Sequence, residues 1–253
     1  MSSALLESFA AARILFSRGS NAMESLSRVA HRRLYPSVTD PSYLVLLSRR
    51  LIFADWVRQL RGEDLAILDI GGRVGPYRPL FGVRARRYVA VDLIPTDFVS
   101  VVADGQMLPF AGETFDVVIA TQVLEYLPDP HGAANQIHSV LKPGGVLLAS
   151  TPAYAPRFGE EEYWRFTPSG LRSLLAPFAT IEIVPELSSV GSLIRTINLA
   201  LDTFARYPSV RFLYRRTACP LLNLIGLGME KAKLTANDQF AANYSVRAVK
   251  AAR

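Results

Sequence analysis

Acidic side chains stand at the ends of three apolar runs of the sequence, as Asp69, Asp92 and Asp104. Apolar runs of this length are typical of buried parallel strands. The turn directly after the first acid is rich in glycine, with Gly71, Gly72 and Gly75. Glycine lets a backbone turn tightly and pass close to a ligand. The pattern therefore predicts acids and a flexible turn at the ends of neighbouring strands.

The chemistry that these residues suit is nucleoside binding. Ligands of open α/β sheets sit at the carboxyl ends of the strands. Asp92 stands 23 positions after Asp69, where a carboxylate can accept both hydroxyls of an adenosine ribose. The glycine turn alone is equally compatible with an ordinary strand–turn–helix junction. A nicotinamide-dependent oxidoreductase would need G-x-G-x-x-G, which the sequence lacks.

Five motifs in order make the sequence similar to a known family. They read DIGGRVG at 69–75, VD at 91–92, ADGQMLPF at 103–110, FDVVIATQVLEYL at 115–127 and LKPGG at 141–145. The chain resembles the class I S-adenosylmethionine-dependent methyltransferases, in particular the type 11 group related to the ubiquinone/menaquinone methylases. The resemblance is close from residue 65 to 152. Two positions depart from the family pattern: Arg73 replaces a glycine of the loop, and Tyr126 replaces a histidine.

The resemblance implies a doubly wound, Rossmann-like α/β fold with seven strands, and S-adenosylmethionine as the cofactor. The last strand, Asn243–Lys250, would pair antiparallel to Ile181–Val184. A first core helix would start at Gly75–Phe81 and point its N-terminus at the cofactor carboxylate. The cofactor-binding residues carried over are Asp69, Gly71, Gly72, Gly75, Asp92, Leu93, Asp104, Gly105, Gln106, Thr121 and Gln122. Arg73 would strain the loop if φ had to be positive there, and it would crowd or pair with the cofactor.

Two helices are expected before the core, in a helical cover that spans residues 1–62. The first lies within Met1–Arg33. The second, Tyr43–Leu60, carries Leu47, Leu51, Ala54 and Val57 on one face. Arg49 is expected on an ordinary solvated face of this helix, with cofactor covering as the alternative. The methyltransferase domain would span 63–253 and hold a helical insertion at about 188–238.

The acceptor side is expected in the loop Pro152–Thr167, which follows the fifth strand and contains the run EEEYWRFT. Loops beyond strand ends carry specificity. Tyr163, Trp164 and Arg165 are the predicted acceptor-binding residues, against the alternative of a loop held in place by its aromatics. Methyl transfer to oxygen, nitrogen or carbon needs a base only if the acceptor must lose a proton. Tyr126, His131, Glu161 and Tyr163 are candidates by location alone.

The insertion combines apolar and basic residues. Its apolar stripe consists of Val190, Leu193, Ile194, Ile197, Leu201 and Phe204. Residues 190–235 hold seven Lys/Arg and two acids, a net charge of +5 within a chain total of +6. The expected rim of this stripe is Arg195, Arg206, Arg211, Arg215 and Arg216. This pattern suits an anionic membrane surface, or a hydrophobic acceptor tail with a phosphate that arginine would bind through two parallel hydrogen bonds. It predicts peripheral membrane contact with a lipid or lipid-linked glycan precursor as acceptor, against a cap or homodimer interface.

Composition narrows the remaining classes. Cys219 is the only cysteine of the 253 residues, which excludes an internal disulfide, and the three histidines show no metal-ligand spacing. The basic charge sits on the appendages, so no nucleic-acid partner is expected. The expected location is cytoplasmic, with the inner face of the membrane as the alternative. A small-molecule acceptor is the simplest partner, and a non-catalytic protein that binds S-adenosylmethionine is the competing function.

Overall fold

A computed structural model describes residues 19–154, 156, 161–233 and 237–252, with the side chains of 19–23 left undescribed. Its centre is a seven-stranded sheet in the order β3-β2-β1-β4-β5-β7-β6. The parallel strands are β1 (Leu65–Ile70), β2 (Ala85–Asp92), β3 (Val101–Val102), β4 (Phe115–Thr121) and β5 (Leu141–Pro152). The order reverses direction between β1 and β4. Such a switch point leaves a crevice at the carboxyl ends of these strands.

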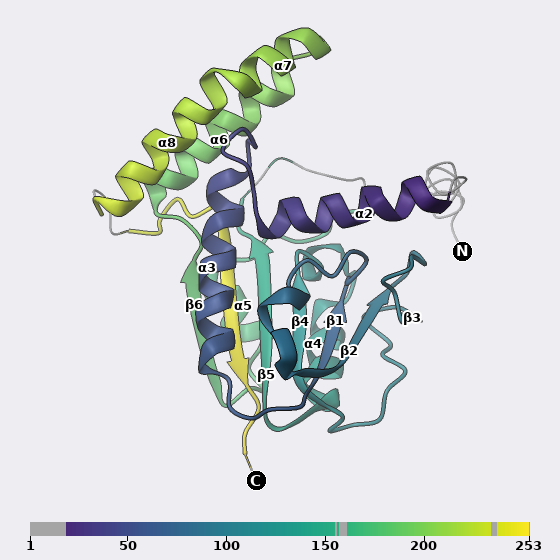
Figure 1. The fold of residues 1–253 in the computed structure, drawn as a ribbon. Coiled ribbons are helices and arrows are strands. Elements are labelled where there is room, and N and C mark those ends of the chain that lie inside the picture. Colours follow the sequence, from purple (N-terminus) through teal and green to yellow (C-terminus); the bar gives the residue numbers. More distant parts are fainter. Residues whose placement is uncertain (1–18, 155, 157–160, 234–236, 253) are drawn as a thin grey trace.

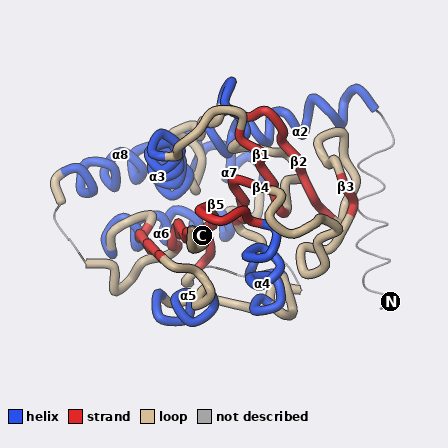
Figure 2. Tube along the Cα trace, turned by 90° about the horizontal axis from the view of Figure 1, so that it is seen from below, coloured by secondary structure: helices blue, strands red, loops and turns tan. Residues whose placement is uncertain are grey.

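The antiparallel strand is β7 (Asn243–Val249), which lies between β5 and β6 (Thr180–Pro185). This arrangement confirms the predicted seven-stranded α/β fold. The apolar runs form strands because β1, β4 and β5 are covered on both faces. One face packs against α4 (Pro130–Val140) and α5 (Pro168–Leu174). The other packs against α3 (Tyr43–Gln59), so helices flank the sheet on both sides (Figure 2).

The helix predicted to start at Gly75–Phe81 does not form. Two 3-10 turns, η1 (Arg78–Leu80) and η2 (Gly82–Arg84), connect β1 to β2 instead. Pro79 lacks the N–H that a helix interior needs, and Gly82 adopts a φ of +53°. The expected helix N-terminus is therefore missing from the predicted cofactor site.

The buried face of α3 also differs from the prediction. It consists of Leu44, Val45, Arg49, Phe53, Trp56 and Val57. Leu51, expected to face inward, is 56% exposed. Apolar periodicity predicts a stripe that excludes Arg49, but Arg49 donates a hydrogen bond to the buried carboxylate of Glu186, the residue after β6, so this side of the helix faces inward. The ionic partner, which lies far away in the sequence, decides the orientation.

The helices outside the sheet lie near its carboxyl edge. In Figure 1, α2 (Gly19–Leu34) crosses above the carboxyl ends of the parallel strands. The insertion forms α6 (Ser189–Phe204), α7 (Pro208–Arg216) and α8 (Ala218–Lys231), which stand beyond the top of α3. In the part of the chain described here, no helix combines the length and the apolar character that a membrane span needs.

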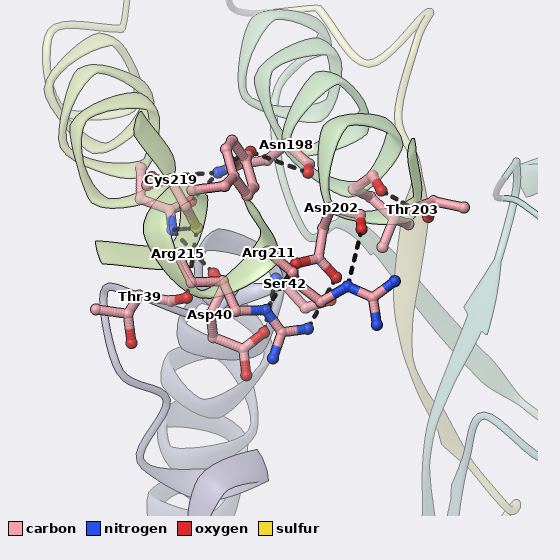
Figure 3. A network of polar contacts seen from close by, with 12 residues as sticks. Thr39, Asp40, Ser42, Asn198, Asp202, Thr203, Arg211, Arg215 and Cys219 are labelled. Atoms are coloured by element: carbon pink, nitrogen blue, oxygen red, sulfur yellow. Dashed lines mark hydrogen bonds and ion pairs between the residues drawn. The ribbon is translucent and has the colours of Figure 1, made fainter. Parts of the chain in front are cut away.

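Polar contacts hold the insertion in one place (Figure 3). Arg215 donates two hydrogen bonds to the carboxylate of Asp202, at 2.6 and 2.8 Å. The buried amide of Asn223 donates to the carbonyl oxygens of Val38 (2.7 Å) and Asp40 (2.9 Å). The insertion is therefore fixed to the segment between α2 and α3. This segment positions the insertion beside the carboxyl edge of the sheet.

Candidate functional site

The glycine turn lies at the switch point between β1 and β4. Gly71 has a φ of +70°, and a Cβ there would collide with the side chain of Val123. At Gly72, a Cβ would lie 2.8 Å from the carbonyl oxygen of Asp69. The amide of Gly71 donates to the carbonyl oxygen of Val91 at 2.8 Å, which ties the turn to the end of β2. Only glycine fits these positions, and the turn brings the ends of β1, β2 and β4 together.

Arg73 fits the turn without strain. Its φ is not positive, so the expected backbone penalty is absent. Its carbonyl oxygen accepts a hydrogen bond from the hydroxyl of Thr96 at 2.9 Å, which holds the loop after β2 against the glycine turn. A glycine at position 73 would therefore relieve no backbone strain. Arg73 instead adds a positive charge close to Asp92, where it lowers the pKa that burial raises.

The three predicted acids occupy different environments. Asp69 is buried, and its Oδ2 accepts a hydrogen bond from the hydroxyl of Tyr88 at 2.6 Å. Burial raises the pKa of Asp69 to about 7. Asp92 and Asp104 are half-buried at the edge of the crevice. Asp92 accepts from the amide of Ile94 at 2.8 Å, and Asp104 accepts from the amide of Gln106 at 2.9 Å. Asp92 and Asp104 are thus the acids within reach of a bound molecule.

Other predicted cofactor residues surround these acids. Gly105 is buried, and a Cβ there would lie 2.9 Å from Ile70 Cγ2. Leu93 is 48% exposed in the loop after β2. The side chain of Gln106 contacts both Asp104 and the amide of Asp129, the latter at 2.9 Å. The sheet therefore brings the acids and the glycine turn to one edge, as predicted.

Gln122, at the end of β4, adopts an unusual backbone conformation. Its φ is +53°, which is rare for a residue with a side chain. Its amide donates to the carbonyl oxygen of Ser150 at 2.8 Å, and its Nε2 donates to Ser150 Oγ at 3.1 Å. Strained positions of this kind cluster at functional sites. Thr121, half-buried beside it, ends the strand.

A buried ion pair lies beneath Gln122. Arg49 Nε donates to Glu186 Oε1 at 2.7 Å, and Arg49 Nη2 donates to Glu186 Oε2 at 2.9 Å. Ser150 Oγ (2.5 Å) and Ser245 Oγ (2.9 Å) also donate to Glu186 Oε1. The prediction that Arg49 lies on a solvated helix face is therefore wrong. This network connects α3, β5 and β7 with the residue that follows β6, and it supports the end of β4 through Ser150.

Glu125 is a buried carboxyl group that the sequence reasoning missed. It lies in η3 (Leu124–Tyr126), and 1% of its surface is exposed. Among the described residues, its Oε2 has no hydrogen-bond partner. Burial raises the pKa of Glu125 to about 8, so it holds a proton at neutral pH. The sequence signal for Glu125 is a single acid between two apolar runs.

Arginine side chains give this edge of the sheet a positive excess. The charge of Arg33, on α2, interacts through space with the charges of Arg49 and Arg73 and with the hydroxyl groups of Tyr77 and Tyr126. Loss of hydration lowers the pKa of Arg33, although part of its surface remains exposed. None of the hydrogen bonds found in the described residues pairs the Arg33 side chain with a carboxylate. An anionic group bound here would therefore meet two available cations, Arg33 and Arg73.

The predicted acceptor residues lie on the far side of η3. The amides of Tyr163 (2.8 Å) and Trp164 (3.2 Å) donate to the carbonyl oxygen of Glu125, and Trp164 Nε1 donates to that of Leu127 at 2.9 Å. Arg165 pairs with Glu162 at 2.8 Å. The Trp164 ring therefore fixes the loop to η3. This contact agrees with the alternative that the loop is held in place by its aromatic residues. Tyr163 is 52% exposed and free to contact a ligand.

The weaker catalytic candidates separate in space. Tyr126 is 38% exposed beside Glu125 and Glu162, and burial of its ring raises its pKa. Glu161 is exposed in the loop, and His131 is exposed near the start of α4. None of the contacts in the described residues joins His131 to the glycine turn or to the acids. Of these candidates, Tyr126 lies nearest to the buried groups of the site.

The seven-stranded order, the glycine turn at the switch point and the acids after β1, β2 and β3 define the class I methyltransferase fold. A family model described as "Methyltransferase domain" matches residues 46–179. The chain therefore belongs to the methyltransferase-domain family.

Similar proteins carry the name methyltransferase. An uncharacterized methyltransferase of Mycobacterium sp. (strain JLS) is 32% identical over 106 residues, which cover 38% of this chain and 42% of that protein. One of Mycobacterium leprae (strain Br4923) is 30% identical over 108 residues, with 38% and 40% covered. The match thus spans about two fifths of these relatives.

Two solved structures share the fold. The [4+2]-cyclase SpnF is 19% identical with a TM-score of 0.50, and 80% of this chain and 82% of that chain are covered. A chain from the complex that holds the Haloferax volcanii Trm112 methyltransferase activator is 16% identical with a TM-score of 0.52, with 80% and 89% covered. At these identities the likeness concerns the fold and not the substrate.

Proposed function

We propose that this protein transfers a methyl group from S-adenosylmethionine to an oxygen, nitrogen or carbon atom of an acceptor. The observation that carries the proposal is the cradle at Gly71 and Gly72, which a Cβ would fill, with Asp92 and Asp104 at its rim. A backbone that approaches a ligand closely beside two carboxylates fits a nucleoside cofactor. The residues present therefore fit S-adenosylmethionine.

The roles of the chain's own residues follow from their positions. Asp92 would accept the ribose hydroxyls, and Asp104 would accept from the adenine amino group. Arg33 and Arg73 supply positive charge for the cofactor carboxylate. S-adenosylmethionine supplies a methyl group already activated on a sulfonium. The protein then contributes alignment of the acceptor and exclusion of water, and Glu125 and Tyr126 lie closest for a proton transfer if the acceptor needs one.

The first prediction concerns cofactor binding. Asp92→Ala removes a charge-assisted acceptor that contributes about 1.5–3 kcal/mol for each hydrogen bond it receives. We expect the affinity for S-adenosylhomocysteine to fall at least about tenfold in Asp92→Ala and to fall in Asp104→Ala, by isothermal titration. Asp97→Ala, an exposed acid in the loop after Asp92, is the matched control and should bind normally. Unchanged affinity in both test variants would remove the cofactor assignment.

The competing function is cofactor binding without methyl transfer. SpnF, named as a cyclase, shows that this fold also supports other reactions. Radiolabelled S-adenosylmethionine incubated with the protein and cell extract separates the two. Label that moves into extract molecules supports the transferase. Intact S-adenosylhomocysteine binding without any labelled product supports the competing function.

We further propose that the acceptor is presented at an anionic membrane surface, as a lipid or a lipid-linked glycan precursor. An exposed apolar stripe runs along α6 through Leu193, Ile197, Leu201 and Phe204. Exposed basic residues of the insertion are Arg206, Arg216, Lys231 and Lys233. Two members of the predicted basic rim differ: Arg195 is buried and Arg215 pairs with Asp202. The remaining charge still suits anionic lipid, where each basic residue contributes about 1 kcal/mol.

Liposome flotation tests this membrane contact. We expect the protein to float with vesicles that contain anionic lipid, less so at high salt, and not with neutral vesicles. Leu201→Glu should abolish flotation because it places a charge in the apolar stripe. Thr203→Glu, on an exposed polar position of the same helix, is the control for added charge. A stable dimer that never floats would instead identify the stripe as a subunit interface.

A further inference from the structure

Arg195, on α6, is a buried cation whose side chain makes no hydrogen bond within the part of the chain that the structure describes. Its exposed fraction is 5%, and its Nε and Nη1 atoms are buried without an acceptor among these residues. A guanidinium taken out of water normally receives compensating hydrogen bonds, because the loss of hydration is costly otherwise. The neighbouring position on the helix, Thr196, satisfies its own hydroxyl. An unpaired arginine in a packed region therefore needs an explanation.

The carboxylate of Glu186 makes no hydrogen bond with Arg195 among those found in the described residues. Glu186 lies in electrostatic contact with Arg195, but its two oxygens already accept from Arg49, Ser150 and Ser245. Two buried guanidinium groups, of Arg49 and Arg195, thus share one carboxylate. Loss of hydration and the charge of Arg49 both lower the pKa of Arg195, against the opposing effect of Glu186. The region holds one positive charge in excess.

The position of Arg195 is on the acceptor side of the site. Tyr154, in the segment after β5, is in electrostatic contact with it. The Tyr154 hydroxyl contacts Thr196 Oγ1 at 2.6 Å and donates to the carbonyl oxygen of Ser192 at 3.3 Å, one helical turn along α6. Tyr154 also lines a surface hollow with Ala153, Thr167, Pro168, Asp238 and Tyr244. Arg195 does not itself line this hollow, but Tyr154 joins the hollow to α6 at Ser192 and Thr196, on either side of Arg195.

We propose that Arg195 binds an oxyanion, a phosphate or a carboxylate, carried by the methyl acceptor. The proposal rests on the proposed methyl transfer and adds the chemical class of the acceptor. Arginine is suited to this role because it remains charged and its planar nitrogens match the oxygens of phosphate and carboxylate. Asp238 lines the same hollow, but its carboxylate accepts from the Tyr244 hydroxyl at 3.3 Å. The bound oxyanion would neutralise the excess charge between α6 and the sheet.

The test compares anion binding by the full chain and three variants. Inorganic phosphate and succinate, at constant ionic strength against chloride, should raise the melting temperature of the wild type. Arg195→Met should lose this response, with phosphate affinity reduced at least about tenfold by titration calorimetry. Arg195→Lys should retain part of it. Arg206→Met removes an exposed arginine of the same insertion and should respond like the wild type, which separates specific binding from general salt effects.

Two further readouts make the test decisive. In chloride, Arg195→Met should melt at a higher temperature than the wild type because it removes an uncompensated buried charge. Affinity for S-adenosylhomocysteine should stay unchanged in Arg195→Met, so a failed cofactor assignment and a failed anion site give different results. Vesicles of phosphatidylcholine with and without phosphatidic acid identify the source: a response that needs phosphatidic acid and is lost in Arg195→Met indicates a lipid phosphate, and a response to free phosphate indicates a soluble acceptor.

A wild type whose melting temperature responds to neither free anions nor phosphatidic acid would overturn the proposal. So would an Arg195→Met variant that responds to phosphate as the wild type does. A lower melting temperature of Arg195→Met in chloride would show that Arg195 is already compensated within the fold. That result would also count against an anion site.

Discussion

Glu186→Gln is expected to lower the free energy of unfolding by about 3–5 kcal/mol. The change keeps the size of the side chain but removes the charge that compensates Arg49. Arg49 is 5% exposed and donates two hydrogen bonds to this carboxylate, at 2.7 and 2.9 Å. Removing one partner of a buried pair leaves the other as an uncompensated buried charge. Denaturation by urea at pH 7 measures the loss.

Glu182→Gln is the matched control. It lies on β6, the strand that Glu186 follows, but its side chain is 47% exposed and lies 3.9 Å from Arg247. Exposed pairs of this kind contribute about 0–1 kcal/mol. The double variant Arg49→Met/Glu186→Leu should recover much of the lost stability, since replacing both charges removes the imbalance. Equal effects of Glu186→Gln and Glu182→Gln would show that the buried pair does not hold the fold.

Glu125→Gln is expected to make the protein more stable at pH 8 and to leave it unchanged near pH 4. Burial raises the pKa of Glu125 to about 8 in the folded protein, above the ordinary value of 4.5 that holds when unfolded. Below 4.5 the group is protonated in both states. Between the two values the unfolded state releases the proton and the folded state keeps it, so stability falls as pH rises. Each unit of pKa difference corresponds to about 1.4 kcal/mol.

The measurement is the difference in unfolding free energy between Glu125→Gln and the wild type across this pH range. We expect it to grow to about 3–5 kcal/mol at pH 8, because glutamine has no proton to lose. Burial also raises the pKa of Asp69, to about 7, so a residual slope should remain in the variant. Glu161→Gln, exposed in the neighbouring loop, should show no such difference. A flat difference for Glu125→Gln would mean that this carboxyl is charged at neutral pH.

The sequence by itself determined the sheet and the edge at which the acids and the glycine turn meet. Parallel strands that are buried on both faces must be continuous apolar runs. The acids and glycines stand at the end of a run or within a few residues of it. These are local signals, so the placement of Asp92 and Asp104 and the need for glycine at Gly71 could be predicted. The prediction of a helix that starts at Gly75–Phe81 was wrong because Pro79 lacks the N–H that the interior of a helix needs.

Only the tertiary structure decided which charges are buried and paired. Arg49 and Glu186 are 137 positions apart, and no local pattern distinguishes this pair from a solvated arginine and a surface acid. Arg195 fits an exposed basic rim by sequence, yet packing leaves 5% of it exposed and two of its nitrogens unpaired. In the sequence, Glu125 is likewise a single polar residue in a turn. In the structure it is buried, and the loop at Tyr163 is hydrogen-bonded to its backbone. The cost of burying a charge depends on what lies around it, and that is set by contacts between segments far apart in the chain.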